Sequence, residues 1–143
     1  MNREEVKALT APCGLDCFNC RLYLAGSDDD IRKENMAMFH VSHEEAACKG
    51  CRPENGLCPV RRLNGLGLCK VYRCVAEKGI YSCAECSDFP CDNLHPFAEH
   101  ASLLPHNTKV FNLALIRKMG LEKWAEEKAK SVKETYFFGK FEI

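Results

Sequence analysis

The eleven cysteines of this 143-residue chain are the side chains with the clearest chemical potential. Two cysteines separated by two residues can bind the same metal ion and form half of a tetrahedral thiolate site. Three pairs have this C-x-x-C spacing: Cys17 with Cys20, Cys48 with Cys51, and Cys83 with Cys86. A complete site needs two such halves, and the other cysteines supply several completions. The spacing alone therefore leaves the pairing open.

One grouping of ligands is favoured among these completions. It joins Cys48 and Cys51 to Cys69 and Cys74, because the resulting C-x2-C-x17-C-x4-C spacing is close to that of zinc ribbons and treble clefs. A second site then takes the last three cysteines and a fourth ligand from the N-terminal three. These six residues are Cys83, Cys86, Cys91, Cys13, Cys17 and Cys20. We expect two structural zinc ions, with Cys58 as a non-ligand.

Iron–sulfur binding is the main alternative to zinc. The spacing Cys13-x3-Cys17-x2-Cys20 is that of radical S-adenosylmethionine enzymes, but the chain lacks the alternating strands and helices of their barrel. A zinc ion with an open coordination position near the same cysteines is a further alternative. The carboxylates beside cysteines are Asp16, Glu85 and Asp88. A dithiol-exchange site would need a βαβ pattern around the motif, which the sequence does not show.

Other side chains near the cysteines suggest two further hypotheses. His40 and His43 precede Cys48 and could replace a thiolate as a ligand. A nucleic-acid or protein adaptor would use the basic group near Cys69. This group consists of Arg61, Arg62, Lys70 and Arg73. Aromatic residues do not alternate regularly with these cations, so a solvated face is the favoured interpretation.

The composition indicates where the cysteines remain reduced. The hydrophobic fraction of 46% includes all eleven cysteines, so the apolar core is thin and metal would help to stabilise it. Residues 1–7 contain no apolar segment of a signal peptide, and no stretch is apolar enough for a membrane span. We therefore expect a cytoplasmic protein with free thiols. Its zero formal net charge disfavours nucleic acid and membranes as partners, and a protein partner is left open.

The elements that position the cysteines are predicted to be helices and irregular loops. Residues 70–78 have helical periodicity, carry Cys74 and end at Gly79. Helices are also predicted over residues 21–25, 31–40 and 92–100. Gly50 supplies the open backbone that lets amide groups point at the sulfurs of a zinc knuckle.

The C-terminal third has the strongest helical periodicity. One helix is predicted from about residue 105 to Gly120, with Phe111, Leu115 and Met119 facing inward, and a second from Leu121 to about residue 132. The tail at 136–141 is predicted to dock as a strand or loop.

The fold class is thus a mostly α, small metal-stabilised single domain over residues 1–143. It combines cysteine-rich zinc-knuckle loops (11–94) with a C-terminal helical hairpin (95–143).

Four motifs resemble those of a family of short cysteine-rich bacterial and archaeal proteins, catalogued as a domain of unknown function. They are CGLDCFNC (13–20), CKGC (48–51), the C-x4-C at 69–74, and the run from EKG (77–79) through C-x2-C (83–86) to FPC (89–91). Residues 105–107 and 120–124 are similar to a helical extension of many members. The resemblance implies a cytoplasmic zinc-binding protein with no established activity. Because the zinc is expected to be structural, a binding or scaffolding module is favoured over an enzyme. Many members have a further cysteine just before Cys69, where this chain has Gly67 and Leu68.

Overall fold

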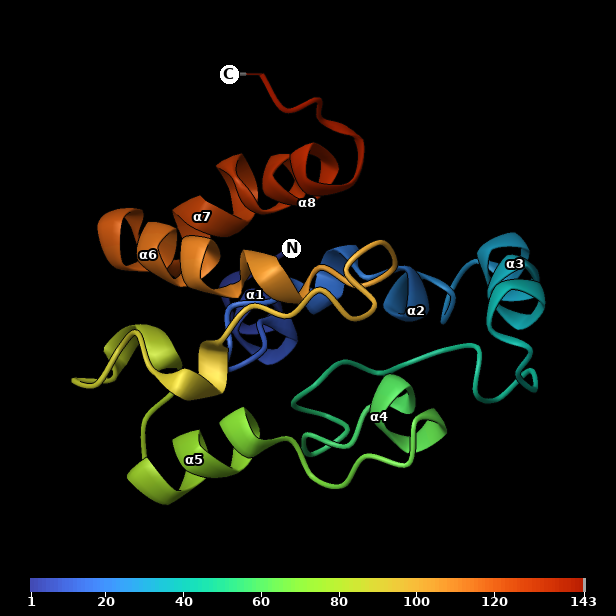
Figure 1. The fold of residues 1–143 in the computed structure, drawn as a ribbon, viewed down its shortest axis with the longest axis horizontal. Helices are drawn as coiled ribbons and strands as arrows, with labels where there is room; N and C mark the ends of the chain where they lie inside the picture. The colour runs from blue at the N-terminus through green and yellow to red at the C-terminus, as the bar shows by residue number, and fades with distance from the viewer. Residues whose placement is uncertain (143) are drawn as a thin grey trace.

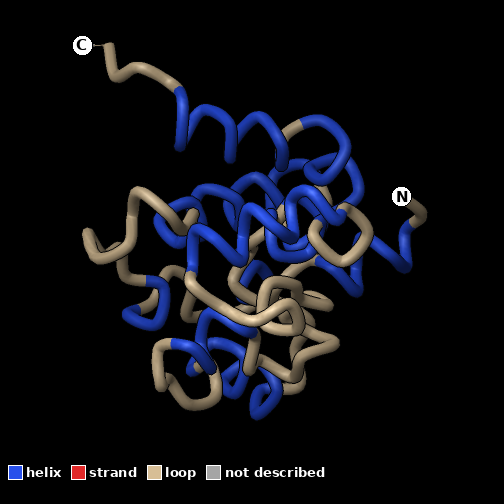
Figure 2. Tube along the Cα trace, turned by 90° about the vertical axis from the view of Figure 1, so that its right-hand side faces the viewer, coloured by secondary structure: helices blue, strands red, loops and turns tan. Residues whose placement is uncertain are grey.

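The computed structural model describes residues 1–142, and within that range the chain is helical with long loops and no β-strand (Figure 2). The α-helices are α1 (Arg3–Leu9), α2 (Arg21–Leu24), α3 (Asp29–Phe39), α4 (Pro59–Leu63), α5 (Lys70–Lys78), α6 (Lys109–Met119), α7 (Leu121–Glu127) and α8 (Ala129–Phe138). Four short 3-10 turns are η1 (Cys17–Asn19), η2 (Cys83–Glu85), η3 (Asp92–Leu94) and η4 (His106–Thr108). The mostly α prediction is confirmed. Among residues 1–142, no helix has the length and apolarity to cross a membrane.

The helices are arranged around the cysteine-bearing loops. The C-terminal helices α6, α7 and α8 stack on one side, and α4 and α5 lie on the other (Figure 1). Helix α1 contacts α7, and α6 contacts the η2 turn, so the N-terminal helix packs against the C-terminal helices. Helices α2 and α3 pack against each other at one end of the molecule.

Helix α6 joins two apolar clusters. The first cluster is centred on α5 and α6 and consists of Val71, Val75, Cys83, Ala84, Leu94 and Leu113. The second is centred on α7 and consists of Leu9, Phe18, Trp124 and Ala129. Ile116 of α6 packs against both clusters. Burying these side chains is the main apolar contribution to stability, and three of the cysteines, Cys13, Cys17 and Cys69, lie at the edges of the clusters.

A buried hydrogen-bond chain connects α6 to the N-terminal cysteine loop. Asn112 is 1% exposed, and its Nδ2 atom donates to the carbonyl oxygen of Gly14 at 2.9 Å. Its Oδ1 atom accepts from the indole nitrogen of Trp124, which is fully buried, at 3.3 Å. Because both polar groups of the amide are satisfied, the network fixes the loop between Cys13 and Cys17 against α6 and α7.

Several helix predictions are confirmed. Helix α5 covers residues 70–78, carries Cys74 and ends at Gly79, which has a left-handed φ of 63°. Helix α3 is capped by Asp28, whose side chain accepts from the amides of Asp30 and Ile31. The C-terminal helices also form, with Gly120 between α6 and α7. Strong periodicity combined with a capping residue was therefore sufficient to locate these helices.

Four details of the predictions are wrong. Residues 92–100 form only the η3 turn, because the chain becomes extended at His95 before Pro96. The predicted second C-terminal helix is divided at Lys128 into α7 and α8. The tail does not dock as a strand or loop, since residues 136–138 continue α8 and Phe138 is 83% exposed. Phe111 faces solvent at 58% exposure, and Asn112 takes the inward position beside Leu113.

Candidate functional site

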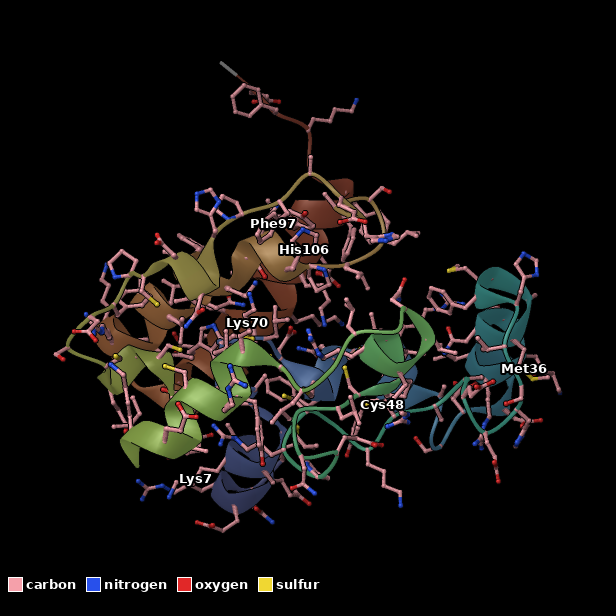
Figure 3. All side chains as sticks on the ribbon, turned by 60° about the horizontal axis from the view of Figure 1, so that its bottom comes forward. Lys7, Met36, Cys48, Lys70, Phe97 and His106 are labelled. Carbon is pink, nitrogen blue, oxygen red and sulfur yellow. The ribbon has the colours of Figure 1, made fainter. Side chains whose placement is uncertain are left out.

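All eleven cysteines are free thiols, and they line two cavities. The seven-thiol cavity has a volume of about 280 Å³ and is lined by Cys13, Cys17, Cys20, Cys48, Cys51, Cys58 and Cys69. The four-thiol cavity has a volume of about 260 Å³ and is lined by Cys74, Cys83, Cys86 and Cys91. Figure 3 shows Cys48 in the loop region, with Lys70 at the start of the neighbouring helix α5.

Backbone hydrogen bonds bring distant cysteines together in the seven-thiol cavity. The amide of Cys51 donates to the sulfur of Cys17 at 3.4 Å, which joins the second C-x-x-C motif to the first. The amide of Cys48 donates to the carbonyl oxygen of Leu22 in α2, close to Cys20. The amide of Cys69 donates to the carbonyl oxygen of Gly56, two residues before Cys58. The cavity is thus built from four chain segments.

Two glycines allow the close approach of these segments. Gly50 has a φ of 104°, and its amide donates to the sulfur of Cys48 at 3.3 Å, so the predicted role of Gly50 is confirmed. Gly14 has a φ of 83°, and a Cβ atom there would lie 2.8 Å from Cγ of Leu113. A side chain at either position would strain the backbone, and at Gly14 it would also collide with α6.

Two arginines that the sequence analysis missed hold the cysteine loops in place. Arg52 donates from Nε to the carbonyl oxygen of Thr10 at 2.7 Å and from Nη2 to that of Tyr81 at 2.6 Å. Arg117 of α6 donates from Nε to the carbonyl oxygen of Ala84 at 2.5 Å and from Nη2 to that of Cys86 at 2.6 Å. Each planar guanidinium group uses its fixed pair of donors to connect segments that are far apart in the chain. The only signal in the sequence is that Arg52 directly follows Cys51.

The seven-thiol cavity contains a set of four thiols that we name thiol group 1: Cys13, Cys17, Cys51 and Cys69. Burial raises the pKa of Cys51, and the thiols of Cys13, Cys17, Cys69 and Cys58 raise it further. Burial also raises the pKa of Cys17 to about 12, although the hydrogen bond from the Cys51 amide opposes this shift. Burial therefore disfavours the thiolate forms of Cys51 and Cys17 unless a cation replaces the protons.

The other three thiols of this cavity form thiol group 3: Cys20, Cys48 and Cys58. Burial raises the pKa of Cys48 to about 12, and the Cys58 and Cys20 thiols add to the rise. Burial likewise raises the pKa of Cys58, while the amide and the positive charge of Arg61 lower it. Cys17 and Cys20 are neighbours, so groups 1 and 3 adjoin each other inside one cavity.

The four-thiol cavity holds thiol group 2: Cys74, Cys83, Cys86 and Cys91. Burial raises the pKa of Cys83 to about 11, and the thiols of Cys91, Cys86 and Cys74 raise it further. Lys78 lies at the edge of this group, with its Nζ atom 3.5 Å from the sulfur of Cys86 and 2.5 Å from Oδ2 of Asp88. The hydrogen bonds to Asp88 and to the Cys86 sulfur raise the pKa of Lys78, so its positive charge is kept beside the thiol group.

The two cavities adjoin each other. Val71 of α5 is buried and lines both of them. The Cys69 thiol contributes to the raised pKa of Cys83, which lies in the other cavity. The amide of Cys83 also donates to the carbonyl oxygen of Pro12 at 2.9 Å, which links η2 to the N-terminal cysteine loop. All eleven sulfurs therefore belong to one continuous region of the molecule.

The polar groups around the seven-thiol cavity give it a positive lining. Asp16 is 3% exposed and pairs with Lys133, whose Nζ atom lies 3.1 Å from Oδ1 of Asp16. These two charges offset each other. Arg61 and Lys109 also line the cavity, and the positive charge of Lys109 lowers the pKa of Cys13 against the effect of burial. Such a lining favours an anionic occupant, for example a metal bound by several thiolates.

The two cavities divide the cysteines differently from the expected ligand sets, and those sets stay a prediction. Cys74 was expected to join Cys48, Cys51 and Cys69, but it lines the four-thiol cavity with Cys83, Cys86 and Cys91. Cys83, Cys86 and Cys91 were expected to take a ligand from the N-terminal three, which line the seven-thiol cavity. The Cys83 thiol nevertheless adds to the raised pKa of Cys13 across the two cavities. Cys58, expected to be a non-ligand, lines that cavity as well. The cause is the direction of α5, which starts after Cys69 at one cavity and carries Cys74 into the other.

The remaining candidate ligands are occupied elsewhere. Within residues 1–142, no set of three or more His, Cys, Asp and Glu side chains is spaced to hold one metal ion. His43 pairs with Asp29 at 3.9 Å, and Glu85 accepts from the amide of Tyr81. In the basic group, Arg61 donates to the carbonyl oxygen of Gly67, and Arg62 pairs with Glu54 at 3.0 Å. These contacts leave thiols as the main chemical groups of the site.

Two comparisons with known proteins gave no match, and one did. No curated protein and no solved structure matches the chain. A family model described as "Protein of unknown function (DUF3795)" matches residues 9–96. The matched range contains all eleven cysteines, and therefore the thiols of both cavities. It ends before helix α6.

Proposed function

The chain belongs to the DUF3795 family of proteins of unknown function, and from the cysteine region that defines the match we propose that this protein binds metal through clustered thiolates. In this proposal thiol groups 1 and 2 each hold one zinc ion, and both ions are structural. The metal-bound chain is then a binding or scaffolding module of a reducing compartment such as the cytoplasm.

The observation that carries this proposal is the sorting of the cysteines in space. Eleven free thiols from separate segments line two adjoining cavities, and each cavity contains a set of four. Four thiolates are the usual ligands of a closed structural zinc site. A cysteine side chain has a single χ1 torsion, so a change of rotamer moves its sulfur while the backbone stays in place.

The local hydrogen bonds support the same chemistry. In thiol group 1 the Cys51 amide donates to the Cys17 sulfur, and in thiol group 2 Lys78 lies beside the Cys86 sulfur. Donors that point at sulfur stabilise the thiolate form and orient the ligand. The fold has thin apolar clusters, and zinc would supply folding energy that these clusters lack.

An iron–sulfur protein is the second candidate, and the volume of the cavities is compatible with it. The sulfurs line spaces of about 280 and 260 Å³, which are large enough for a polynuclear core as well as for a single ion. Thiolate ligands serve both kinds of centre. The positive lining formed by Arg61 and Lys109 would suit the net negative charge of either one.

Elemental analysis of protein purified without air tests the proposal. We expect about two tightly held zinc equivalents per chain, with one lost in Cys17→Ser and the other in Cys86→Ser. Ser87→Ala is the matched control, because Ser87 is an exposed neighbour of Cys86 whose hydroxyl contacts Asp88 instead of the cavity. Iron with acid-labile sulfide and a brown colour would select the second candidate. Absence of any bound metal would refute both.

A further inference from the structure

Residues 138–142, which we name the aromatic tail, are exposed to solvent. Phe138 is 83% exposed and Phe141 is 91% exposed, more than any other large apolar side chain among residues 1–142. The chain leaves α8 at Gly139, where the backbone is extended, with φ −67° and ψ 145°. The tail therefore runs away from the helices instead of folding back onto them (Figures 1 and 2). Two neighbouring phenyl rings exposed to this extent are typical of a segment that contacts a partner.

A mostly apolar groove with a volume of about 510 Å³ lies between α6 and α8. Phe111 and Leu115 form its wall on α6, and Val132 and Tyr136 form its wall on α8. The periodicity of α6 predicts that Phe111 faces inward, yet this side chain is 58% exposed. The groove is thus an apolar surface that a single chain leaves in contact with water.

The groove is separate from the cysteine cavities. Among the described residues, none that lines the groove also lines either cavity. Helix α8 directs Lys133 towards the seven-thiol cavity, where it pairs with Asp16, and it directs Val132 and Tyr136 towards the groove. Whatever occupies the groove therefore leaves the cysteines accessible.

The aromatic tail and the groove match each other in length and in charge. Along α8 the groove extends from Lys128 to Tyr136, which is about 12 Å at the rise of an α-helix. The tail spans about 13 Å from Phe138 to Glu142 when it is extended. Lys128 forms no ion pair among residues 1–142, although other lysines of α7 and α8 do. The tail carries a carboxylate at Glu142, which can supply the missing partner of Lys128.

A second copy of the chain can place its tail in the groove more directly than the same chain can. The tail starts beyond the Tyr136 end of its own groove, so it would have to reverse direction at Gly139, where the backbone is extended. The C-terminal end of a second α8, approaching antiparallel to the first, directs its tail from Tyr136 towards Lys128 without any reversal. The same arrangement is reciprocal, because a two-fold axis gives both copies the same contact.

We propose that this protein forms a two-fold symmetric dimer in which the aromatic tail of each copy occupies the groove between α6 and α8 of the other copy. Phe138 and Phe141 lie against the apolar walls and bury Phe111, and Glu142 pairs with Lys128 at the far end. Such an interface is small, so the association is weak, with a dissociation constant in the micromolar range. The dimer does not depend on the proposed metal binding.

Sedimentation velocity of the full-length chain over a range of concentrations tests the dimer. Reducing buffer excludes intermolecular disulfides from the result. We expect a monomer–dimer equilibrium that the double variant Phe138→Ser/Phe141→Ser weakens by at least about tenfold, through loss of apolar burial. Met38→Ser is the matched control, because it removes a 49% exposed apolar side chain from α3, far from α8 (Figure 1). A wild type that stays monomeric at several hundred micromolar, or a double variant that dimerises as strongly as the wild type, would overturn the proposal.

Two further measurements distinguish exchange of the tails from other contacts. Phe111→Glu should also weaken the dimer by at least about tenfold, because it places a carboxylate in the groove, and far-ultraviolet circular dichroism checks that the helices persist. The photoreactive residue p-benzoylphenylalanine, introduced in place of Phe141, should cross-link to groove residues of an isotope-labelled second copy. A cross-link confined to one chain would mean that the tail folds back onto its own groove. That result, or the absence of any cross-link to the groove, would contradict the exchange.

Discussion

The backbone amide of Cys51 donates a hydrogen bond to the sulfur of Cys17 at 3.4 Å. This contact joins two motifs that are 34 positions apart in the chain, and it places them in the same cavity. It also indicates how the site is organised. The cysteines of each thiol group come from separate loops, with short helices between them along the chain. Because a metal ion would have to join these loops, folding and metal binding are expected to depend on each other.

Cys83→Ala should destabilise the metal-bound protein much more than Cys58→Ala does. Cys83 is buried in the apolar cluster and belongs to a four-thiol group, whereas Cys58 is partly exposed and belongs to the three-thiol group. Structural zinc contributes on the order of 10 kcal/mol to folding, so loss of one ligand should cost roughly 3 kcal/mol or more. Thermal unfolding with and without chelator measures this difference. Equal melting temperatures of the two metal-bound variants would contradict the assignment of ligands.

Gly14→Ala should lower the free energy of unfolding by about 2–4 kcal/mol. The substitution adds a Cβ atom 2.8 Å from Leu113 Cγ and 3.2 Å from the carbonyl oxygen of Lys109, at a φ of 83°. Gly65→Ala is the matched control, because Gly65 also has a positive φ, of 63°, but its Cβ would meet no atom within 4 Å. Urea denaturation of both variants separates the collision from the backbone strain. A similar loss in both would show that the collision with α6 is unimportant.

Asn112→Ala should cost about 2–4 kcal/mol, because it leaves the Trp124 indole nitrogen and the Gly14 carbonyl oxygen buried without partners. A double-mutant cycle with Trp124→Phe isolates the part due to the indole contact. We expect a coupling energy of about 1 kcal/mol between the two positions. Additive effects of the two substitutions would mean that the network does not link α6 to α7.

Arg52→Lys should destabilise the protein nearly as much as Arg52→Ala, by roughly 2 kcal/mol. Lysine keeps the charge but loses the planar pair of donors that reaches the Thr10 and Tyr81 carbonyl oxygens. It also weakens the stacking of the guanidinium group, which lies 4.0 Å from the centre of the Tyr81 ring. Arg32→Lys, at an exposed position with one backbone contact, is the control and should cost little. Full rescue by Arg52→Lys would show that charge alone is sufficient.

The sequence was informative where the signal is local. Helix α5 was predicted with its bounds, because Val71, Cys74 and Val75 have helical spacing and Gly79 ends the pattern. The turn at Gly50 was predicted because a C-x-G-C motif needs an open backbone conformation. The helix predicted over residues 92–100 failed, since a few apolar residues at helical spacing did not outweigh the effect of Pro96.

The grouping of the cysteines was not accessible from spacing, because spacing records distance along the chain and not the direction of the elements between ligands. Cys69 and Cys74 are separated by four residues, yet they line different cavities because α5 turns away between them. The contacts that decide the grouping are long-range. Arg52 reaches Thr10 across 42 positions, and Asn112 reaches Gly14 across 98. No local pattern in the sequence identifies either partner.

The central claim is that thiol groups 1 and 2 bind metal. The accessibility of the thiols, measured together with the native mass of the protein, tests this claim most directly. Protein purified without air is treated with iodoacetamide in its native state, before and after a strong chelator, and weighed by native mass spectrometry. The account predicts that the untreated protein carries at least two metal equivalents and that the eight thiols of groups 1 and 2 react only after chelation. A mass equal to that of the chain alone, with all eleven thiols reacting at the same rate before and after chelation, would contradict it.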